Sequence, residues 1–300
     1  MQKTAFIAIV GRPNVGKSSI LNKILGQKIT IVSSKPQTTR TRIMGVYTKD
    51  DVQLVFIDTP GLHKPKNSLG KYMVRSINES VAGVDACLLV AECDREPGDT
   101  EKMLMQRFES MGIPSVLALN KIDKLKEKSD VITTIASYSK EHSFDDIVPV
   151  SAQTGSGINE LIDALSKQAD EGEHMFDPDT LTDQPERVLA GEIIREKILR
   201  LTDKEIPHGT AVVIERFKQR SEGGITDIDA TIYCERANHK GIIIGKGGAM
   251  LKKIGTYARQ DMENFFDCKI NLTLWVKVKE DWRNREGILR SLGYDESNFD

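Results

Sequence analysis

This chain of 300 residues lacks the features that mark secreted, membrane and metal-cluster proteins. Its four cysteines include no Cys-x-x-Cys pair, which excludes the common zinc motifs and argues against a disulfide framework. Five scattered histidines show no ligand spacing, so we expect no metal held by Cys or His. No run of about 18 apolar residues occurs, and the N-terminus lacks the apolar core and cleavage site of a signal peptide. We therefore predict a cytoplasmic protein.

The chain also lacks an excess of charge of either sign. Its 42 Lys and Arg residues oppose 44 Asp and Glu residues, for a formal charge of −2. That balance excludes a uniformly basic nucleic-acid coat and leaves room for a local basic patch. The hydrophobic content of 39% is high enough to build a core. The length predicts about two domains.

The first half alternates apolar, strand-like runs with helical patterns. Strands are predicted at 5–10, 52–57, 85–92, 115–120 and 146–152, with helices at 17–25, 69–82, 99–111, 127–141 and 158–169. Such alternation predicts βαβ units, that is, a mostly parallel sheet flanked by helices. Ligands bind such sheets at the carboxyl ends of the strands. We assign residues 1–170 to this α/β domain.

A phosphate-binding loop follows the first strand. Residues 11–18 read GRPNVGKS, which satisfies GxxxxGK[ST] between a strand and a helix. Backbone N–H groups would surround the phosphates, Lys17 would neutralise the β and γ oxygens, and the Ser18 hydroxyl would take one magnesium position. A merely flexible glycine turn leaves Lys17 and Ser18 unexplained. The nucleotide-binding residues predicted here are Gly11, Arg12, Pro13, Asn14, Val15, Gly16, Lys17, Ser18 and Ser19.

Two further segments fit a phosphate-dependent switch. Asp58, Thr59, Pro60 and Gly61 end a strand; the Asp58 carboxylate can hold magnesium and the Gly61 N–H can meet a γ-phosphate. Alone, this tetrapeptide is common loop chemistry. Between it and the loop lies the polar segment 37–41, where the Thr39 hydroxyl can complete the magnesium shell only when a γ-phosphate is present.

The last two strands end in residues that suit a guanine base. In Asn120-Lys121-Ile122-Asp123, the Asp123 carboxylate can accept hydrogen bonds from guanine N1–H and its 2-amino group, a donor pair that adenine lacks. Asn120 can brace the loop, and the Lys121 stem can pack over the ring. A backbone N–H of Ser151 or Ala152 can reach guanine O6. Any one of these short motifs also suits a surface turn.

Together, in this order, the motifs resemble those of the TrmE–Era–EngA class of GTPases. The resemblance implies GTP and GDP as ligands, Mg²⁺ held by Ser18, Thr39 and Asp58, and Lys17, Thr39 and Gly61 as the catalytic residues that act on the reacting phosphate. A phosphotransferase would leave the guanine motif unexplained. Leu62 stands where other GTPases carry a water-positioning glutamine, which predicts slow intrinsic hydrolysis. Some members of the class hold K⁺ through the asparagine that corresponds to Asn14, so we hypothesise potassium activation; the alternative is a turn residue.

The second half has a different organisation. Residues 171–186 are acidic, contain prolines and lack periodicity, which predicts a linker. A helix then begins near Pro185, followed by two strand-like runs, a short helical segment, a glycine loop, a longer helix to about Phe266 and a final strand. The predicted order over residues 187–300 is α-β-β-α-α-β, an α+β domain.

The glycine loop of this domain suits a nucleic-acid backbone. Residues 245–248 read GKGG and satisfy GxxG, and the run from Arg236 to Gln260 holds six basic residues and no acidic one. A lone GxxG is weak, and a basic run usually means a solvated face. The predicted RNA-binding residues are Gly245, Lys246, Gly247, Gly248, Lys252 and Lys253. We expect Phe265, Phe266 and Trp275 in the core.

This half resembles a type II KH domain, and the whole chain resembles the Era family. The resemblance implies binding to the 3′ end of small-subunit ribosomal RNA, a role in 30S subunit assembly, and peripheral contact with the inner face of the cell membrane; we expect no DNA partner. We further expect GTP and Mg²⁺ to order the segments around Thr39 and 58–70 and so bias the KH domain. The alternative is a membrane-associated signalling GTPase whose KH-like domain binds protein.

Overall fold

The computed structural model describes residues 1–33, 35, 38–61, 65, 67–125, 127, 130–203, 206–221 and 223–294. Contacts divide the chain into two compact units. The first consists of Met1–Thr30, Thr39–Lys64 and Met73–Asp183, and the second of Ile31–Thr38, Pro65–Tyr72 and Gln184–Asp300. Two short segments from the first half of the sequence therefore cluster with the second unit.

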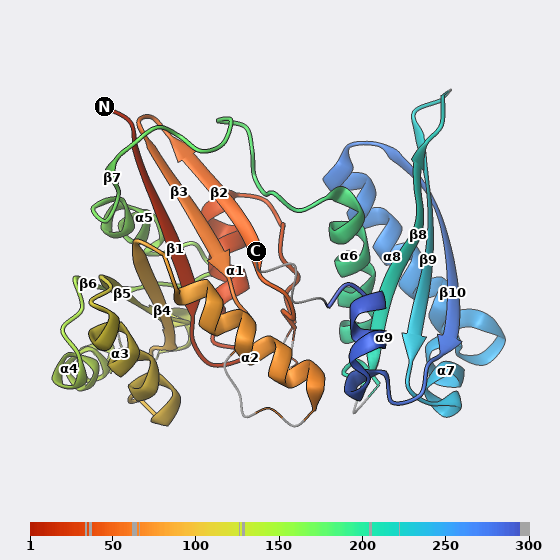
Figure 1. The fold of residues 1–300 in the computed structure, drawn as a ribbon, viewed down its shortest axis with the longest axis horizontal. Helices are drawn as coiled ribbons and strands as arrows, with labels where there is room; N and C mark the ends of the chain where they lie inside the picture. The colour runs from red at the N-terminus through yellow and green to blue at the C-terminus, as the bar shows by residue number, and fades with distance from the viewer. Residues whose placement is uncertain are drawn as a thin grey trace. The chain divides into compact units, whose positions relative to one another are not determined.

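The first unit is built on a mostly parallel sheet, as the sequence predicted (Figure 1). Its strands run in the order β2-β3-β1-β4-β5-β6, with β2 antiparallel to β3 and the short β7 antiparallel to β1. The strand bounds are β1 Lys3–Val10, β2 Ile43–Lys49, β3 Val52–Asp58, β4 Ala86–Glu92, β5 Ser115–Asn120, β6 Asp146–Pro149 and β7 Asp170–Glu171. Strand β2 was not predicted from the sequence, because a glycine interrupts its IMGVYTK run.

Helices cover both faces of this sheet. Their bounds are α1 Lys17–Leu25, α2 Ser68–Val81, α3 Asp99–Met111, α4 Asp130–Glu141 and α5 Ile158–Ser166. Buried side chains of α2, α3 and α4 form a core with one face of β1, β4 and β5. Helices α1 and α5 contact each other and the strands as well. Strands β3, β4 and β5 are buried on both sides, which explains their continuous apolar runs.

The acidic stretch after α5 lies along the first unit. Gly172 donates to the Gln2 carbonyl at 3.0 Å, and the buried Gln53 Oε1 accepts the backbone N–H of Met175 at 2.8 Å. Further along, Val46 N–H donates to the Leu181 carbonyl at 2.9 Å. These bonds place residues 171–183 with the first unit, whereas their composition led us to assign them to a linker. The acidic side chains of this stretch are mostly exposed, while its backbone forms hydrogen bonds with the first unit.

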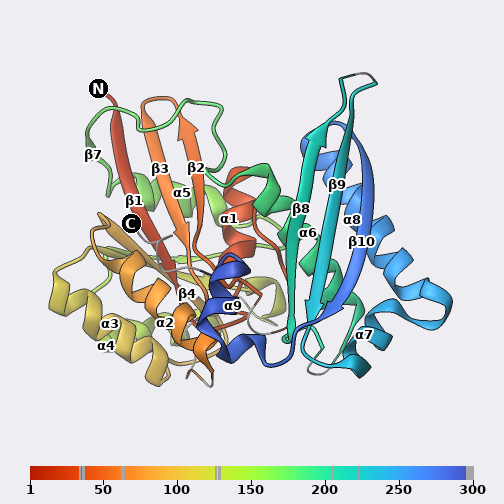
Figure 2. The same cartoon turned by 45° about the vertical axis from the view of Figure 1, so that its right-hand side comes forward.

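The second unit has the predicted order with one helix added at its end (Figure 2). The elements are α6 Glu186–Leu201, β8 Thr210–Gln219, β9 Ile225–Cys234, α7 Ala237–Ile244, α8 Ala249–Phe266, β10 Lys269–Val278 and α9 Glu286–Ser291. The sheet runs β10-β9-β8, with β8 antiparallel and β10 parallel to β9. In the part of the chain described, no helix combines the length and apolar character needed to cross a membrane.

The core of the second unit lies on one face of this sheet. Alternate β9 residues, Ile228, Ala230 and Ile232, pack there against α6 and α8. Phe266 packs partly buried against this core, as expected. The expectation for Trp275 was wrong, because its neighbours along β10 face the core and its own side chain, 47% exposed, lies on the opposite face.

Candidate functional site

The loop between β1 and α1 depends on its glycines. Gly11 and Gly16 have φ angles of 145° and 105°, a region that favours glycine. A Cβ on Gly16 would lie 2.1 Å from Asn120 Nδ2, so a larger residue could not keep this approach. The loop therefore brings its backbone against the strand end that carries the predicted guanine motif.

Lys17, the first residue of α1, is a buried cation in this loop. Its side chain is 6% exposed, and Nζ donates to the carbonyls of Gly11 and Arg12, each at 3.1 Å. Burial lowers the pKa of Lys17 to about 8, and the negative charge of Asp58 partly offsets that fall. Phosphate oxygens beside Lys17 would supply the anionic partners that stabilise its charge.

The three predicted magnesium ligands converge. Ser18 Oγ donates to Asp58 Oδ2 at 2.6 Å and lies 3.0 Å from Thr39 Oγ1. Asp58 is wholly buried, and desolvation raises its pKa to about 6 against the pull of Lys17 and the two hydroxyls. Its Oδ1 makes no hydrogen bond to any described residue. Two hydroxyls and a carboxylate with an oxygen to spare fit the oxygen preference of Mg²⁺. Among the described residues no group of three His, Cys, Asp or Glu side chains could hold a metal.

The rest of the 58–61 segment packs close to the phosphate loop. Thr59 Oγ1 donates to the Ile9 carbonyl at 2.7 Å and so ties the end of β3 to β1. A Cβ on Gly61 would lie 2.7 Å from Pro13 Cα, so this glycine permits a close approach of the two segments. Pro60 is buried beside it. Leu62, which carries our prediction of slow hydrolysis, lies outside the described residues.

Asn120 joins three of the predicted motifs. Its Nδ2 donates to the Val15 carbonyl at 2.8 Å, and its Oδ1 accepts the Ala152 N–H at 3.1 Å. Lys121, at a left-handed φ of 73°, donates from Nζ to the Asn14 carbonyl at 2.8 Å and pairs with Glu92. The side that should hold the base is therefore bonded directly to the side that should hold the phosphates.

Asp123 and Ser151 also meet. Ser151 Oγ donates to Asp123 Oδ1 at 2.5 Å, which fixes one oxygen of the carboxylate and leaves its other edge for a base. The Ser151 N–H donates to the Ser156 carbonyl at 2.8 Å, and the Ala152 N–H is held by Asn120. Binding of guanine O6 by the Ala152 N–H would have to share or replace that bond.

Glu101 is a residue of this site that sequence reasoning missed. It lies at the start of α3, is wholly buried, pairs with Arg12 Nε and accepts the Gly98 N–H at 3.1 Å. The Arg12 carbonyl in turn accepts a hydrogen bond from Lys17, so Glu101 helps to position the phosphate loop. Glu101 itself belongs to none of the predicted nucleotide motifs. The only sequence signal is a glutamate three residues after a helix cap, which predicts a helix start and says nothing of Arg12.

The second candidate site is a groove beside the GxxG loop. Gly245, Gly247 and Gly248 have φ angles of 74°, 57° and 82° between α7 and α8. A groove of about 410 Å³ begins at this loop, and its lining is Gly248, Leu251, Lys252, Gly255, Thr256, Arg259, Leu272 and Leu274. It joins an apolar floor to two cations, the combination that bases and phosphates require.

Of the predicted RNA residues, Gly248 and Lys252 line this groove. Gly245, Lys246 and Gly247 form the loop at its end. Lys253 lies one residue further round α8, with Nζ 5.9 Å from the centroid of the Tyr257 ring. The structure therefore separates Lys252 from Lys253, which the sequence treated alike.

Comparisons with known proteins find a match for each of the two halves of the chain. Residues 6–121 match the family described as 50S ribosome-binding GTPase, and residues 205–283 match the KH domain. GTPase Era of Clostridioides difficile (strain 630) is 48% identical over 296 residues, which cover 99% of this chain and 100% of that protein. GTPase Era of Ruminiclostridium cellulolyticum is 50% identical over 292 residues, 97% of each chain.

Two solved structures are similar over the same extent. One is Era in complex with MgGDPNP and nucleotides 1506–1542 of 16S ribosomal RNA, with 39% identity, a TM-score of 0.94, and coverage of 98% of this chain and 99% of that one. The other is an Aquifex aeolicus Era variant bound to GDP and AlF₄⁻, with the same identity, TM-score and coverage.

Proposed function

This chain belongs to the Era family of GTPases, and from that premise we propose that it is a GTP-hydrolysing switch that binds the 3′ end of small-subunit ribosomal RNA in 30S subunit assembly. The observation that carries the proposal is the convergence of Ser18, Thr39 and Asp58 beside the buried Lys17. A ligand that contains phosphate and carries a divalent cation would interact with all four of these side chains.

The nucleotide half of the function assigns GTP or GDP to the loop at 11–19 and to the motifs at 58–61, 120–123 and 151–152. Bound Mg²⁺ would bridge phosphate oxygens and offset their developing charge. Ser18, Thr39 and Asp58 would hold it, Lys17 would bind the β and γ oxygens, and Gly61 would donate its N–H to the γ-phosphate. Asp123 would select guanine, because its free carboxylate edge accepts the two donors that adenine lacks.

The RNA half assigns a single strand to the groove between α8 and β10. Lys252 and Arg259 would face phosphates, and the leucines of the floor would contact unstacked bases. Gly245, Lys246, Gly247 and Gly248 would let the sugar–phosphate backbone approach the start of α8. Lys253, outside the groove, would contribute only to the local positive field.

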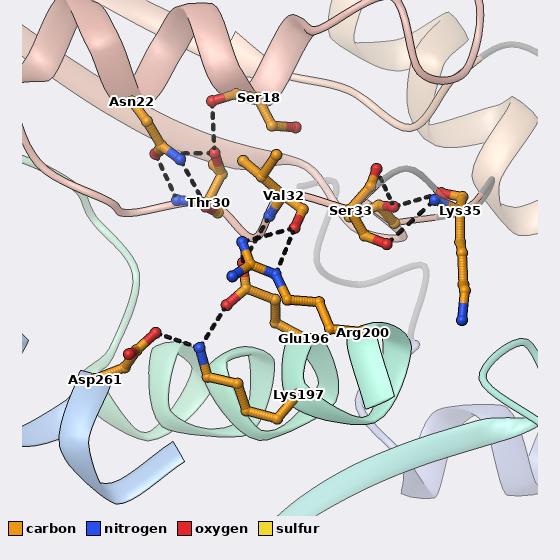
Figure 3. A network of polar contacts seen from close by, with 11 residues as sticks. Ser18, Asn22, Thr30, Val32, Ser33, Lys35, Glu196, Lys197, Arg200 and Asp261 are labelled. Carbon is orange, nitrogen blue, oxygen red and sulfur yellow. Dashed lines mark hydrogen bonds and ion pairs between the residues drawn. The ribbon is translucent and has the colours of Figure 1, made fainter. Parts of the chain in front are cut away.

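The switch is supported by the bonds of residues 31–38, which cluster with the second unit (Figure 3). Glu196 of α6 accepts the Val32 N–H at 3.1 Å, and Arg200 donates to the Val32 carbonyl at 3.2 Å. Arg195, also of α6, donates to the Thr38 carbonyl. Helix α6 therefore holds this segment by its backbone.

The two residues that flank this segment, Thr30 and Thr39, both contact Ser18. Thr30 Oγ1 donates to the Ser18 carbonyl at 3.1 Å, and Thr39 Oγ1 lies 3.0 Å from Ser18 Oγ. A magnesium ion that draws Thr39 and Ser18 into its shell would pull on a chain whose middle is bonded to α6. Within the second unit, Lys197 then links the wholly buried Glu196, at 3.0 Å, to Asp261 of α8, the helix that lines the groove (Figure 3).

Potassium activation through Asn14 belongs to the same proposal. Asn14 adopts a left-handed φ of 65°, a conformation that asparagine tolerates and that also suits a plain turn. Hydrolysis measured in matched KCl and NaCl buffers decides the point: K⁺ activation requires a faster rate in KCl, and equal rates contradict it.

We also propose that the protein acts in the cytoplasm, where its ribosomal partner is. Peripheral contact with the inner face of the membrane stays a prediction from the resemblance. Sedimentation with anionic lipid vesicles, with and without RNA, tests it.

The experiment that tests the switch is RNA affinity measured against nucleotide state. A fluorescent RNA with the small-subunit 3′-end sequence is titrated with protein bound to GDP or to a non-hydrolysable GTP analogue, at one salt concentration because phosphate contacts are salt-dependent. Tighter binding in the analogue state supports the switch. By linkage, RNA must then raise the affinity for the analogue, relative to the affinity for GDP, by the same factor. Equal affinity removes the switch but keeps both sites. Absence of binding in both states favours the protein-binding signalling alternative.

Glu196→Gln sharpens this test. The variant removes the charge that holds Val32 and Lys197, so we expect the ratio of the two RNA affinities to move toward one. Glu186→Gln, at the exposed start of the same helix, is the matched control and should leave the ratio unchanged.

A further inference from the structure

The second unit presents a sheet face opposite to the one that packs on α6 and α8. Along β9, the buried core residues alternate with residues of this outer face. Thr231 on that face pairs with Trp275 of β10 on one side and with Val213 of β8 on the other. Trp275 is 47% exposed, whereas Trp282, the other tryptophan, is wholly buried. A large aromatic ring therefore lies open on this face, on the edge strand β10.

Two lysines follow Trp275 on the same face, toward the end of β10. Tyr233 pairs in register with the exposed Lys277, two residues beyond Trp275 on the same face. Lys279 Nζ lies 5.0 Å from the centroid of the Tyr233 ring, within the range of a cation–π contact. Two aromatic rings and two lysines thus occupy neighbouring positions on one face of the sheet.

The other end of the face is also basic. A cavity of about 460 Å³ lies there, lined by Arg216, Lys218, Gln219, Arg220, Ser221 and Asp227. Hydrogen bonds from Arg220 and Asn271 hold the pKa of the Asp227 carboxyl well below its usual range. Arg216, Lys218, Arg220 and Lys277, with Lys279 just beyond the strand, outnumber the acids Asp227 and Asp229 on this face, and the bulge of β8 adds one more acid, Glu215. The surface therefore complements a polyanion.

This face is continuous with the RNA groove through a single strand. Strand β10 is at the edge of the sheet, and its residues Leu272 and Leu274 line the groove. The next residue, Trp275, lies on the outer face, with its Cα about 3.8 Å along the chain. A polynucleotide that leaves the groove over this edge therefore meets the indole ring first.

We propose that the outer face, centred on Trp275, binds the nucleotides that flank the groove-bound segment of the same RNA strand. One base stacks on the Trp275 indole, and the neighbouring phosphates lie toward Lys277 and Lys279. The inference rests on the proposed RNA binding in the groove and extends it beyond the roughly four nucleotides that a KH groove clamps. Stacking tolerates any base, so this face adds affinity and length dependence without adding much sequence preference.

The test uses two RNAs and the full chain. The short RNA has about four nucleotides, the length of the groove site, and the long one extends the same sequence about threefold. Because stacking on an aromatic side chain is worth roughly 1–3 kcal/mol per base, Trp275→Ala should weaken the long RNA roughly 5- to 150-fold and leave the short one unchanged. Trp275→Phe, which keeps a ring, should restore most of the affinity, and Val188→Ala, which removes an equally open apolar side chain of α6, should have no effect.

Fluorescence gives a second readout. In a Trp282→Phe background Trp275 is the sole tryptophan, so a stacked base should quench the emission of the protein when the long RNA binds and not when the short one does. Lys277→Glu combined with Lys279→Glu provides an independent variant should Trp275→Ala fail to fold, and it should weaken only the long RNA.

Each other outcome overturns the inference. Equal weakening of both RNAs would mean that Trp275 acts on the groove itself. Unchanged affinity for the long RNA would leave this face to a protein partner. If the unmodified protein binds neither RNA, the proposed function is wrong and the inference is wrong with it. If the unmodified protein binds the short RNA, the proposed function stands and the variants test the inference alone.

Discussion

The nucleotide site and the RNA groove contain similar chemical groups and are built in opposite ways. In the nucleotide site Lys17 and Asp58 are buried, and glycines at 11, 16 and 61 permit approaches that a Cβ would block. In the groove, cations reach in from an open helix face, and Gly247 and Gly248 have open space around them. In the nucleotide site, close packing allows few substitutions at these positions. In the groove, function depends on charge and shape, which several different residues can provide.

Lys17→Ala should produce the largest effect, because it removes the buried cation that we propose to contact the phosphates. Truncating one partner of a buried charge contact costs about 2–5 kcal/mol, so we expect GDP affinity to fall roughly 30-fold or more. A fluorescent GDP analogue measures it. Short-RNA affinity in the absence of nucleotide should stay constant; a parallel loss there would mean that the two sites are not separately built.

Glu101→Gln should come next. The neutral side chain keeps the shape but weakens the hold on Arg12, whose carbonyl positions Lys17. We expect about tenfold weaker GDP binding, corresponding to about 1.4 kcal/mol, and a lower thermal midpoint.

Two comparisons distinguish this positioning role from general damage. GDP should protect the variant against heat less than it protects the unmodified protein. Glu109→Gln, at an exposed position of the same helix, should behave like the unmodified protein. If Glu101→Gln lowers the midpoint but keeps normal GDP affinity, the residue supports the fold alone.

A pH series gives a smaller effect. Burial lowers the pKa of Lys17 to about 8 in the nucleotide-free protein, so the side chain loses its proton as the pH rises through that value. Phosphates need the charged form; GDP affinity measured in EDTA should therefore fall above pH 8, by at most tenfold per pH unit. Circular dichroism at each pH checks that the protein stays folded. Affinity that stays flat or rises between pH 8 and 9.5 would contradict the assigned role of Lys17.

Lys252→Ala and Lys253→Ala form the mildest and most specific pair. Lys252 lines the groove, whereas Lys253 lies near Tyr257. Loss of one phosphate contact should weaken RNA binding about fivefold and reduce the salt slope by about one for Lys252 only. Equal effects of the two substitutions would indicate a diffuse electrostatic surface in place of a groove.

The contrast between the sites also explains what the sequence could predict. Motifs such as residues 11–18 and 120–123 are readable because local backbone geometry demands particular residues at fixed spacing. Strand β2 was missed because its glycine and polar residues hide the alternation, and it forms by pairing with β3. Trp275 was misplaced because composition cannot say which face of an edge strand an aromatic residue occupies.

Contacts between residues far apart in the chain could not be predicted from the sequence. Glu101 meets Arg12 across 89 positions, and Glu196 meets Val32 across 164, and neither pairing has a local pattern. The clustering of residues 31–38 with the second unit is of the same kind, since it depends on bonds to α6 that only the folded chain brings together.

The amide of Asn120 has a consequence for how such a protein can change its ligand. One side chain supports the phosphate loop through Val15 and the base loop through Ala152, and Gly16 is small because that amide occupies the space beside it. Exchanging the loop that we propose to read guanine for one that reads another base would therefore also weaken the support of the phosphate loop. Engineering the base preference of this site therefore requires redesigning the phosphate loop as well.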